Sequence, residues 1–253
     1  MNNPQLSIII PTLNEEKYLP LLLQDLSIQT DKNFEIILVD GNSKDKTIQI
    51  AKKYSLSLPS LQIHSLKQAH VCLQRNIGAK YANSKILLFS DADNRLPPNF
   101  LNDIVQYLSS HQVNILTTWY KPISNLILHK GIALYNNLTQ EVESILKFNY
   151  IQESLVIVDK NTFWEIGGFN SSCNYGEGNE FIRKAYQLNK TINTIRQPYY
   201  YYSFRRYING GFCKLIVRTS YLYFAKIFGD KYRNKISPIL YPMTGGTQYK
   251  KPD

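Results

Sequence analysis

Apolar residues in the first part of the chain fall into short runs separated by longer, partly polar segments. The run at residues 86–89 has four apolar residues in succession, which is typical of a strand buried on both faces of a parallel sheet. Between the runs, leucine, isoleucine or alanine recurs every three or four positions, as on one face of a helix. The pattern predicts strands at residues 6–10, 34–39, 61–64 and 86–89, with helices at 14–26, 45–51 and 74–81.

This alternation predicts an α/β fold with a mostly parallel, Rossmann-like sheet and helices on both of its faces. Residues 99–150 are expected to be mainly helical, in two amphipathic stretches, the second of which is a candidate cover for a site. A further strand is expected at 154–158 and a helix starting near Asn179. No internal repeat, low-complexity tract or clear interdomain linker interrupts the chain.

Polar side chains follow three of the predicted strands, at the edge where a sheet of this kind binds ligands. Asp91 and Asp93 are two carboxylates at i and i+2, and their oxygens suit a hard cation such as Mg²⁺ or Mn²⁺. The alternative is a solvated turn, because aspartate is common where strands end. The three clusters read PTLNE at residues 11–15, DGNS at 40–43 and DAD at 91–93.

The net charge of +10 is concentrated at one end of the chain. Residues 1–182 hold 15 lysines and arginines against 17 acidic residues, whereas residues 183–253 hold 14 against two. The second segment also contains 11 of the 19 tyrosines. A basic, aromatic tail predicts a negatively charged partner, namely a phosphorylated substrate, anionic lipid or, as a minor alternative, nucleic acid.

Three isolated cysteines, at 72, 173 and 213, indicate no disulfide framework and favour a reducing compartment. The apolar run at 6–10 is too short for a signal peptide and lacks a basic leader. No segment reaches the roughly 20 apolar residues that crossing a bilayer needs. We expect a cytoplasmic protein. Residues 214–235, which mix apolar, basic and aromatic side chains, are typical of a helix in a membrane interface, and equally of one packed on the main domain or a dimer partner.

Six motifs, taken together in order, resemble the family 2 glycosyltransferases of GT-A fold. The resemblance covers about residues 1–210, so we expect a catalytic domain over 1–210 and a basic C-terminal extension over 211–253. It implies an inverting transferase of the hexosyltransferase type, a nucleotide-diphospho-sugar donor and a divalent cation, Mn²⁺ or Mg²⁺. The motifs read SIIIPTLNEE at 7–16, ILVDGNSKDKT at 37–47, QRNIG at 74–78, LFSDAD at 88–93, GGF at 167–169 and GEGNE at 176–180.

The resemblance also implies roles for single residues on the donor side. Thr12 and Glu15 would hold the base and ribose, and Asp40 would accept a hydrogen bond from an imide N–H of a uracil-type base. Asp91 would face the ribose and the metal, while Asp93 would bind the metal directly. Arg75 would lie over the nucleotide. The alternatives are turn formation or helix capping for Thr12 and Asp40, and a surface ion pair for Arg75. The predicted nucleotide-sugar-binding set is Pro11, Thr12, Asn14, Glu15, Asp40, Asn42, Arg75, Asp91, Arg205 and Arg206, and the predicted metal ligands are Asp91 and Asp93.

The part of the site expected to carry the general base departs from the family pattern. Inversion needs a general base for the acceptor hydroxyl, which the family usually carries as the aspartate of a Glu-Asp pair. Here the pair is Glu177-Gly178, so Glu177 is the first candidate and Glu180 the second, with capping of a helix N-terminus as the alternative for both. Arg205 and Arg206 are candidates for clamping a phosphate, because guanidinium groups bind phosphate bidentately.

We therefore expect a metal-dependent transferase that moves a sugar from a nucleotide-diphospho-sugar, UDP type favoured, to a glycan or polyprenyl-phosphate-linked acceptor, in polysaccharide biosynthesis. A tail that binds lipid would place it on the inner face of a membrane as a peripheral protein. One alternative is a sugar nucleotidyltransferase, although the loop after the first strand is acidic and glycine-free. Another is a degenerate transferase acting as a scaffold, for which Gly178 is the best support.

Overall fold

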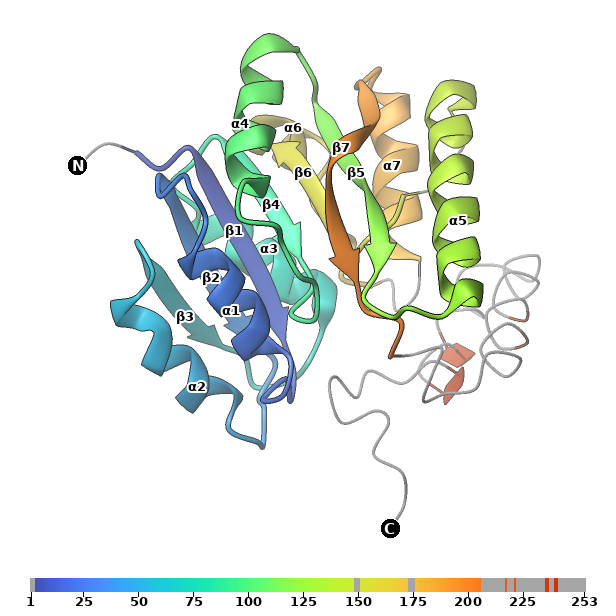
Figure 1. The fold of residues 1–253 in the computed structure, drawn as a ribbon. Coiled ribbons are helices and arrows are strands. Elements are labelled where there is room, and N and C mark those ends of the chain that lie inside the picture. The colour runs from blue at the N-terminus through green and yellow to red at the C-terminus, as the bar shows by residue number, and fades with distance from the viewer. Residues whose placement is uncertain are drawn as a thin grey trace.

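The computed structural model describes residues 3–147, 151–172 and 176–205, together with residues 217, 221, 235–236 and 239–240. Within these residues the chain folds around a seven-stranded mixed sheet (Figure 1). The strands are β1 (Leu6–Thr12), β2 (Phe34–Asp40), β3 (Leu61–Ser65), β4 (Ile86–Ser90), β5 (Ile115–Pro122), β6 (Leu155–Asp159) and β7 (Ile192–Tyr202). Their spatial order is β3-β2-β1-β4-β6-β5-β7.

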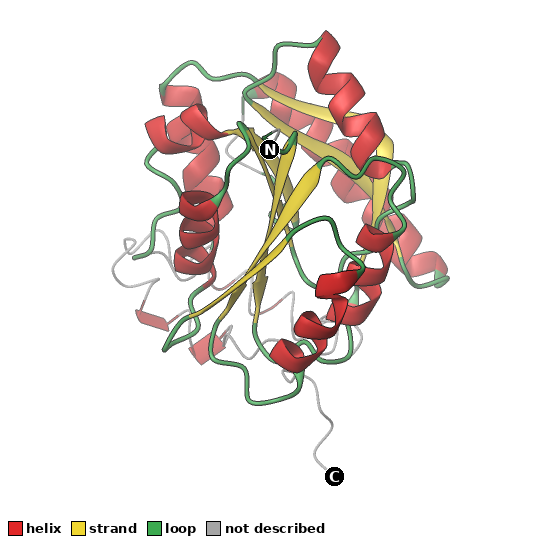
Figure 2. Ribbon diagram, turned by 90° about the vertical axis from the view of Figure 1, so that its left-hand side faces the viewer, coloured by secondary structure: helices red, strands yellow, loops and turns green. Residues whose placement is uncertain are grey.

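Helices cover both faces of the sheet, so the molecule has three layers (Figure 2). Side chains of α1 (Leu19–Ser27), α2 (Thr47–Lys53), α4 (Phe100–Ser110) and α5 (Ile127–Leu146) share one buried apolar cluster. Side chains of α3 (Val71–Tyr81), α6 (Lys160–Glu165) and α7 (Glu177–Gln187) share the other. A 3-10 turn, η1 (Tyr54–Leu56), follows α2. The inner strands β1, β2 and β4 are therefore buried on both sides, as their apolar runs predict, whereas the edge strand β3 is only part-buried.

The direction of the strands decides which loops meet. β1 runs parallel to β2 and β4, and β2 runs parallel to β3, so the carboxyl ends of these strands share one edge, at the bottom of Figure 1. β6 is antiparallel to both β4 and β5, with Leu155 opposite Ser90. Because of this reversal, the beginning of β6 lies at the same edge as the ends of the parallel strands.

The four predicted N-terminal strands are confirmed, but the helix predicted at 14–26 begins only at Leu19, with Pro20 in its first turn. The backbone N–H groups of residues 14–16 are bonded across to the loop after β2 instead. The Asn14 N–H donates to Ser43 Oγ at 2.8 Å, and the Glu15 N–H donates to Thr47 Oγ1 at 2.7 Å. The segment 13–18 is therefore a loop pinned at the sheet edge.

The prediction that residues 99–150 are mainly helical is wrong for β5. This strand carries the sequence ILTTWYKP, rich in β-branched and aromatic residues, and it pairs in parallel with β7, which the sequence patterns did not predict. Their first partners, Ile115 and Ile192, are far apart in the chain. The two strands extend the sheet beyond β6 and bring the segment that ends at Arg205 back to the carboxyl edge.

The predicted basic tail, including residues 214–235, lies almost wholly outside the described residues, and the boundary predicted at 210/211 stays a prediction. In the part of the chain that the structure describes, no helix combines the length and the hydropathy needed to cross a membrane.

Candidate active site

Two strand-end loops are joined by the buried Asp40 at the end of β2. Its Oδ1 accepts a hydrogen bond from the Thr12 hydroxyl at 3.0 Å, and its Oδ2 accepts one from the Ser43 N–H at 2.8 Å. The Ser43 hydroxyl also donates to Oδ1. Since an ionised carboxylate offers about four lone-pair sites, one acceptor site is left at Asp40. Thr12 and Asp40 thus lie together at the sheet edge, as the sequence predicted.

The first loop carries a carboxylate that is buried against an arginine from the far end of the described chain. Glu15 accepts two hydrogen bonds from Arg205, from Nη1 and Nη2, both at 2.7 Å. Burial nevertheless raises the pKa of Glu15 from 4.5 to about 7, and the charges of Asp93 and Asp91 add to the rise against the lowering effect of Arg205. Arg205 therefore binds a carboxylate that is close to its protonation midpoint at neutral pH.

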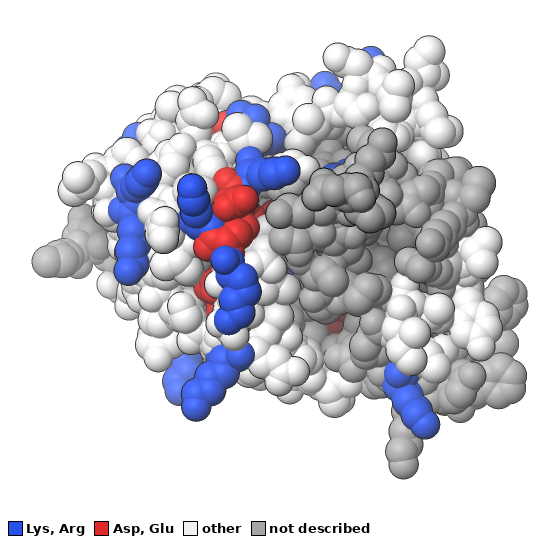
Figure 3. Space-filling model, turned by 90° about the horizontal axis from the view of Figure 1, so that it is seen from below, with Lys and Arg blue, Asp and Glu red and all other residues white. Residues whose placement is uncertain are grey.

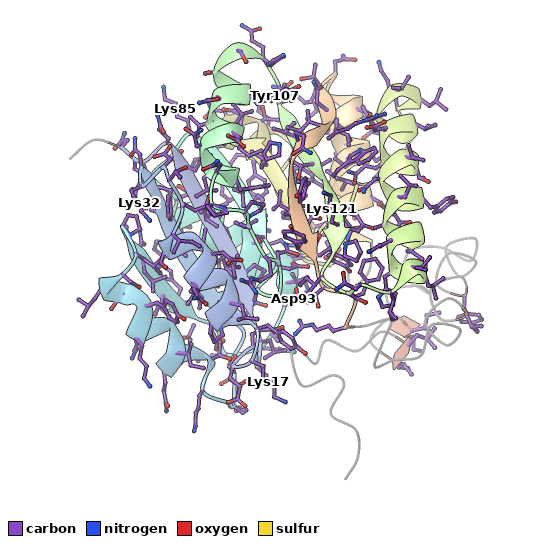
Figure 4. The ribbon with its side chains drawn as sticks, in the orientation of Figure 1. Lys17, Lys32, Lys85, Asp93, Tyr107 and Lys121 are labelled. Atoms are coloured by element: carbon purple, nitrogen blue, oxygen red, sulfur yellow. The ribbon has the colours of Figure 1, made fainter. Side chains whose placement is uncertain are left out.

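Arg205 also holds the second predicted metal ligand. Its Nε lies 2.8 Å from Asp93 Oδ2, and its guanidinium lies over the Tyr18 ring, 4.5 Å from the centroid. The Asp93 side chain is 10% exposed. Asp93 lies at the lower edge of the sheet, where β1 and β7 end (Figure 4). The arginine thus joins the loops after β1, β4 and β7 at one point.

A second arginine, Arg75 on α3, pairs with one carboxylate on the predicted donor side and one on the side of the predicted general base. Its Nη2 lies 3.1 Å from Asp91 Oδ1, and its Nη1 lies 3.3 Å from Glu177 Oε1 at the start of α7. Nη2 also donates to the backbone carbonyl of Glu153 at 3.1 Å. The Arg75 side chain is only 3% exposed, so the alternative of a surface ion pair is wrong. Arg75 is therefore a buried residue that pairs with Asp91 and Glu177 at once.

Glu153, just before β6, is a further carboxylate that the sequence patterns did not single out. Its Oε1 accepts a hydrogen bond from the Gly178 N–H at 2.7 Å. Burial, followed by the neighbouring charge of Glu177, raises the pKa of Glu153 well above its ordinary value, against the lowering effects of Arg75 and the Gly178 N–H. The signal available in the sequence was an acid at the start of a strand, QES at 152–154, which by itself is too common to select.

The other predicted residues occupy more varied places. Glu180 accepts two hydrogen bonds from Asn170 Nδ2, at 2.9 and 3.0 Å, and its Oε1 lies 3.4 Å from Lys184, so it has different partners from Glu177. Asn42, at positive φ in an exposed turn, donates to the Lys67 carbonyl at 3.0 Å. Pro11 is buried in β1, Asn14 is part-buried in the first loop, and Arg206 lies outside the described residues.

The two predicted metal ligands are each paired with a different arginine, Asp91 with Arg75 and Asp93 with Arg205. Among the described residues, no three histidine, cysteine or acidic side chains form a metal-ligand cluster. A hard cation bound with a substrate diphosphate needs only one or two protein carboxylates, because waters and phosphate oxygens complete its shell. The donor set therefore fits Mg²⁺ or Mn²⁺ bound together with a phosphorylated ligand.

Figure 3 shows the molecule from below, on the side where the parallel strands end. Acidic side chains gather near the middle of the described part of this face, with lysines and arginines on both sides of them. The mixture of both charges on this face suits a ligand that carries phosphate and brings a cation with it.

Comparison with known families shows which family the chain belongs to. Residues 7–162 match the family model described as glycosyl transferase family 2, which is more than half of the chain. This chain belongs to glycosyl transferase family 2. The matched range includes Thr12, Asp40, Asp91 and Asp93, and the expectation of a glycosyltransferase is confirmed.

Curated relatives agree with the family. An uncharacterized glycosyltransferase of Haemophilus influenzae is 29% identical over 209 residues, covering 79% of this chain and 68% of that protein. The poly(ribitol-phosphate) beta-N-acetylglucosaminyltransferase TarS of Staphylococcus aureus is 26% identical over 213 residues, covering 79% of this chain. The chain spans only 35% of the length of TarS.

Solved structures confirm the GT-A fold. TarS residues 1–349 in complex with UDP-GlcNAc give a TM-score of 0.65 at 24% identity, covering 79% of this chain and 59% of that one. The mannosyltransferase PcManGT of Pyrobaculum calidifontis, in complex with GDP-Man and Mn²⁺, gives 0.71 at 17% identity, covering 96% and 70%. At these identities the likeness concerns the fold.

Proposed function

We propose that this protein transfers a sugar, with inversion, from a nucleotide-diphospho-sugar to a glycan or polyprenyl-phosphate-linked acceptor. The observation that carries the proposal is that carboxylates from three separate parts of the chain lie at the carboxyl edge of the sheet: Asp40 at the end of β2, Asp91 and Asp93 after β4, and Glu177 at the start of α7. Structures of similar fold are complexes with UDP-GlcNAc and with GDP-Man and Mn²⁺, which supports a donor of this class.

On the donor side, Thr12 and Asp40 are proposed to bind the base, with the remaining acceptor site of Asp40 taking an imide N–H. This favours a UDP-type donor. Pro11, Asn14 and Asn42 would shape the pocket around the nucleotide. Glu15 would face the ribose once Arg205 turns to the diphosphate, where its guanidinium can bind two oxygens at once.

Asp91 and Asp93 would hold Mn²⁺ or Mg²⁺. When bound, the cation supplies positive charge at the diphosphate leaving group. Arg75 keeps Asp91 oriented through the contact at 3.1 Å, so its proposed role is positioning of that carboxylate. On the acceptor side, a carboxylate near the start of α7 would take the hydroxyl proton, with Glu177 and Glu180 as the candidates from sequence.

The acceptor proposal draws on the relatives. TarS is named for poly(ribitol-phosphate), and GgaB of Bacillus subtilis, 25% identical over 214 residues, is named a minor teichoic acid biosynthesis protein. Both names concern polymers, which supports a role in polysaccharide biosynthesis. The basic segment 214–235 is proposed to bring the protein to an anionic membrane surface.

The test is release of nucleotide from a panel of UDP- and GDP-sugars, measured with Mn²⁺, with Mg²⁺ and with EDTA. We expect at least one donor to be turned over in a cation-dependent way, and Asp93→Asn to lower that turnover by about 100-fold or more. Asp103→Asn, on α4, is the matched control because it removes the same charge away from the site.

Wild-type turnover in Asp93→Asn would refute the metal assignment. Absence of turnover for every donor in the wild-type protein would refute the enzymatic proposal and favour the alternative of a non-catalytic scaffold.

A further inference from the structure

The space beside Gly178 is filled by another residue's carboxylate. A Cβ at position 178 would lie 2.4 Å from Glu153 Cγ, and 2.7 Å from both Cδ and Oε1 of the same side chain. Nonbonded atoms do not approach so closely, so no residue larger than glycine fits there while Glu153 stays in place. Position 178 has no side-chain carboxylate, and the Glu153 carboxylate, from the loop before β6, occupies the space beside it.

This side chain is held between the two sides of the site. The Gly178 N–H on α7 donates to Glu153 Oε1 at 2.7 Å, while the Glu153 backbone carbonyl accepts from Arg75 at 3.1 Å. The next residue, Ser154, accepts a hydrogen bond from the Asp91 N–H at 2.9 Å through its backbone carbonyl. The Glu153 carboxylate is therefore fixed relative to the loop that carries Asp91.

Three carboxylates lie near the start of α7, and their partners differ. Glu177 is ion-paired with Arg75, and Glu180 with Lys184. No ion pair joins the Glu153 side chain to a lysine or arginine in the described part of the chain, although Arg75 is near enough to affect its titration. Burial and the charge of Glu177 raise the pKa of Glu153, which makes this carboxylate the stronger base once it is ionised. Glu153 is part-buried as a residue and immediately precedes β6, at the edge of the sheet where the site lies.

We propose that Glu153 is the general base of the transfer, with Glu177 and Arg75 as its positioning residues; this rests on the proposed function. The acceptor hydroxyl would give its proton to the Glu153 carboxylate, and the oxygen's electron pair would form the new bond to the anomeric carbon of the donor sugar. The bond from that carbon to the diphosphate oxygen breaks at the same time, and its electron pair leaves with the nucleoside diphosphate. The glutamic acid then returns its proton to water.

The first experiment compares wild type and Glu153→Gln in nucleotide release from the donor panel, starting with UDP-GlcNAc and Mn²⁺. The glutamine oxygen still accepts the Gly178 N–H, so the variant keeps the contact that a purely structural role would need. We expect kcat to fall by about 100-fold or more while KM for the donor and binding of UDP stay within about twofold. The acid limb of the wild-type pH–rate profile should disappear in the variant. Unchanged kcat, or a loss explained by weaker UDP binding, would overturn the inference.

The second experiment moves the carboxylate back to position 178. Gly178→Asp alone should lower stability, because its side chain meets Glu153, and should not raise activity. Glu153→Ala alone should be nearly inactive, and the double variant Glu153→Ala/Gly178→Asp should regain about tenfold or more over it. A double variant no more active than Glu153→Ala would overturn the placement of the base.

These outcomes separate the two proposals. A wild-type protein inactive on every donor refutes the proposed function itself, whereas an active wild type with an active Glu153→Gln refutes only the role of Glu153.

Discussion

Replacing Glu15 by glutamine tests whether burial outweighs the ion pair with Arg205. Glu15 is 5% exposed and receives two hydrogen bonds of 2.7 Å from that arginine, yet its pKa is raised from 4.5 to about 7. The glutamine keeps the shape and one acceptor oxygen but cannot ionise. The wild-type protein should therefore depend on pH in a way that the variant does not.

The raised pKa of Glu15 sets the size of the expected change in unfolding free energy. One pKa unit corresponds to about 1.4 kcal/mol, so a shift from 4.5 to about 7 is worth about 3 kcal/mol of unfolding free energy. Because the folded-state pKa is the higher one, the folded protein binds the extra proton between these two values. The stabilising contribution is complete below pH 4.5 and is lost as the pH rises through 7.

The assay is urea unfolding of wild type and Glu15→Gln at several pH values from 4.5 to 8.5, without nucleotide or metal. We expect the wild type to lose about 3 kcal/mol relative to the variant over this range, most of it before pH 7.5. Glu16→Gln, on the same loop, controls for the loss of one negative charge. A difference between wild type and Glu15→Gln that is constant with pH would refute the reasoning and show that Arg205 keeps Glu15 ionised throughout.

Four further changes test the packing and the charge network. Gly78→Ala places a Cβ 2.3 Å from Ile9 Cγ2, where α3 packs on β1, and should lower the unfolding free energy by about 1–3 kcal/mol. Gly131→Ala, with nothing within 4 Å, should instead raise it by up to about 1 kcal/mol, and urea unfolding measures both. Arg75→Met leaves two carboxylates without their cation and should cost about 3–5 kcal/mol by the same measurement; a cost below about 1 kcal/mol would contradict the buried pairs. Glu177→Gln removes the charge that raises the pKa of Glu153, so the acid limb of the pH–rate profile should move to lower pH; an upward shift would contradict the coupling.

The sequence predicted the half of the site that depends on local pattern. The run before Asp91 is apolar without interruption because β4 is buried on both faces, and parallel neighbours must end at the same edge. This is why Asp40 and Thr12, 28 positions apart, could be expected together before their hydrogen bond was seen.

The strands β5 and β7 were harder to predict, because these segments form strands only through pairing with segments far away in the chain. β5 contains two threonines and a lysine, and it forms a strand by pairing with β6 on one side and with β7 on the other. The polar spacing in such a segment does not distinguish a strand from a helix. The same pairing delivers Arg205 to Glu15, a contact across 190 positions that no local pattern indicates.

The sequence by itself determined the family, the four N-terminal strands and the polar groups at their ends, because these follow from burial and from the common direction of parallel strands. The sequence also has glycine at position 178, but the sequence alone does not explain why. Only the tertiary structure decided that β6 runs against its neighbours, so that Glu153 enters at the carboxyl edge and fills the space that the glycine leaves. Which carboxylate reaches that point depends on strand direction and side-chain volume, and both are properties of the packed molecule.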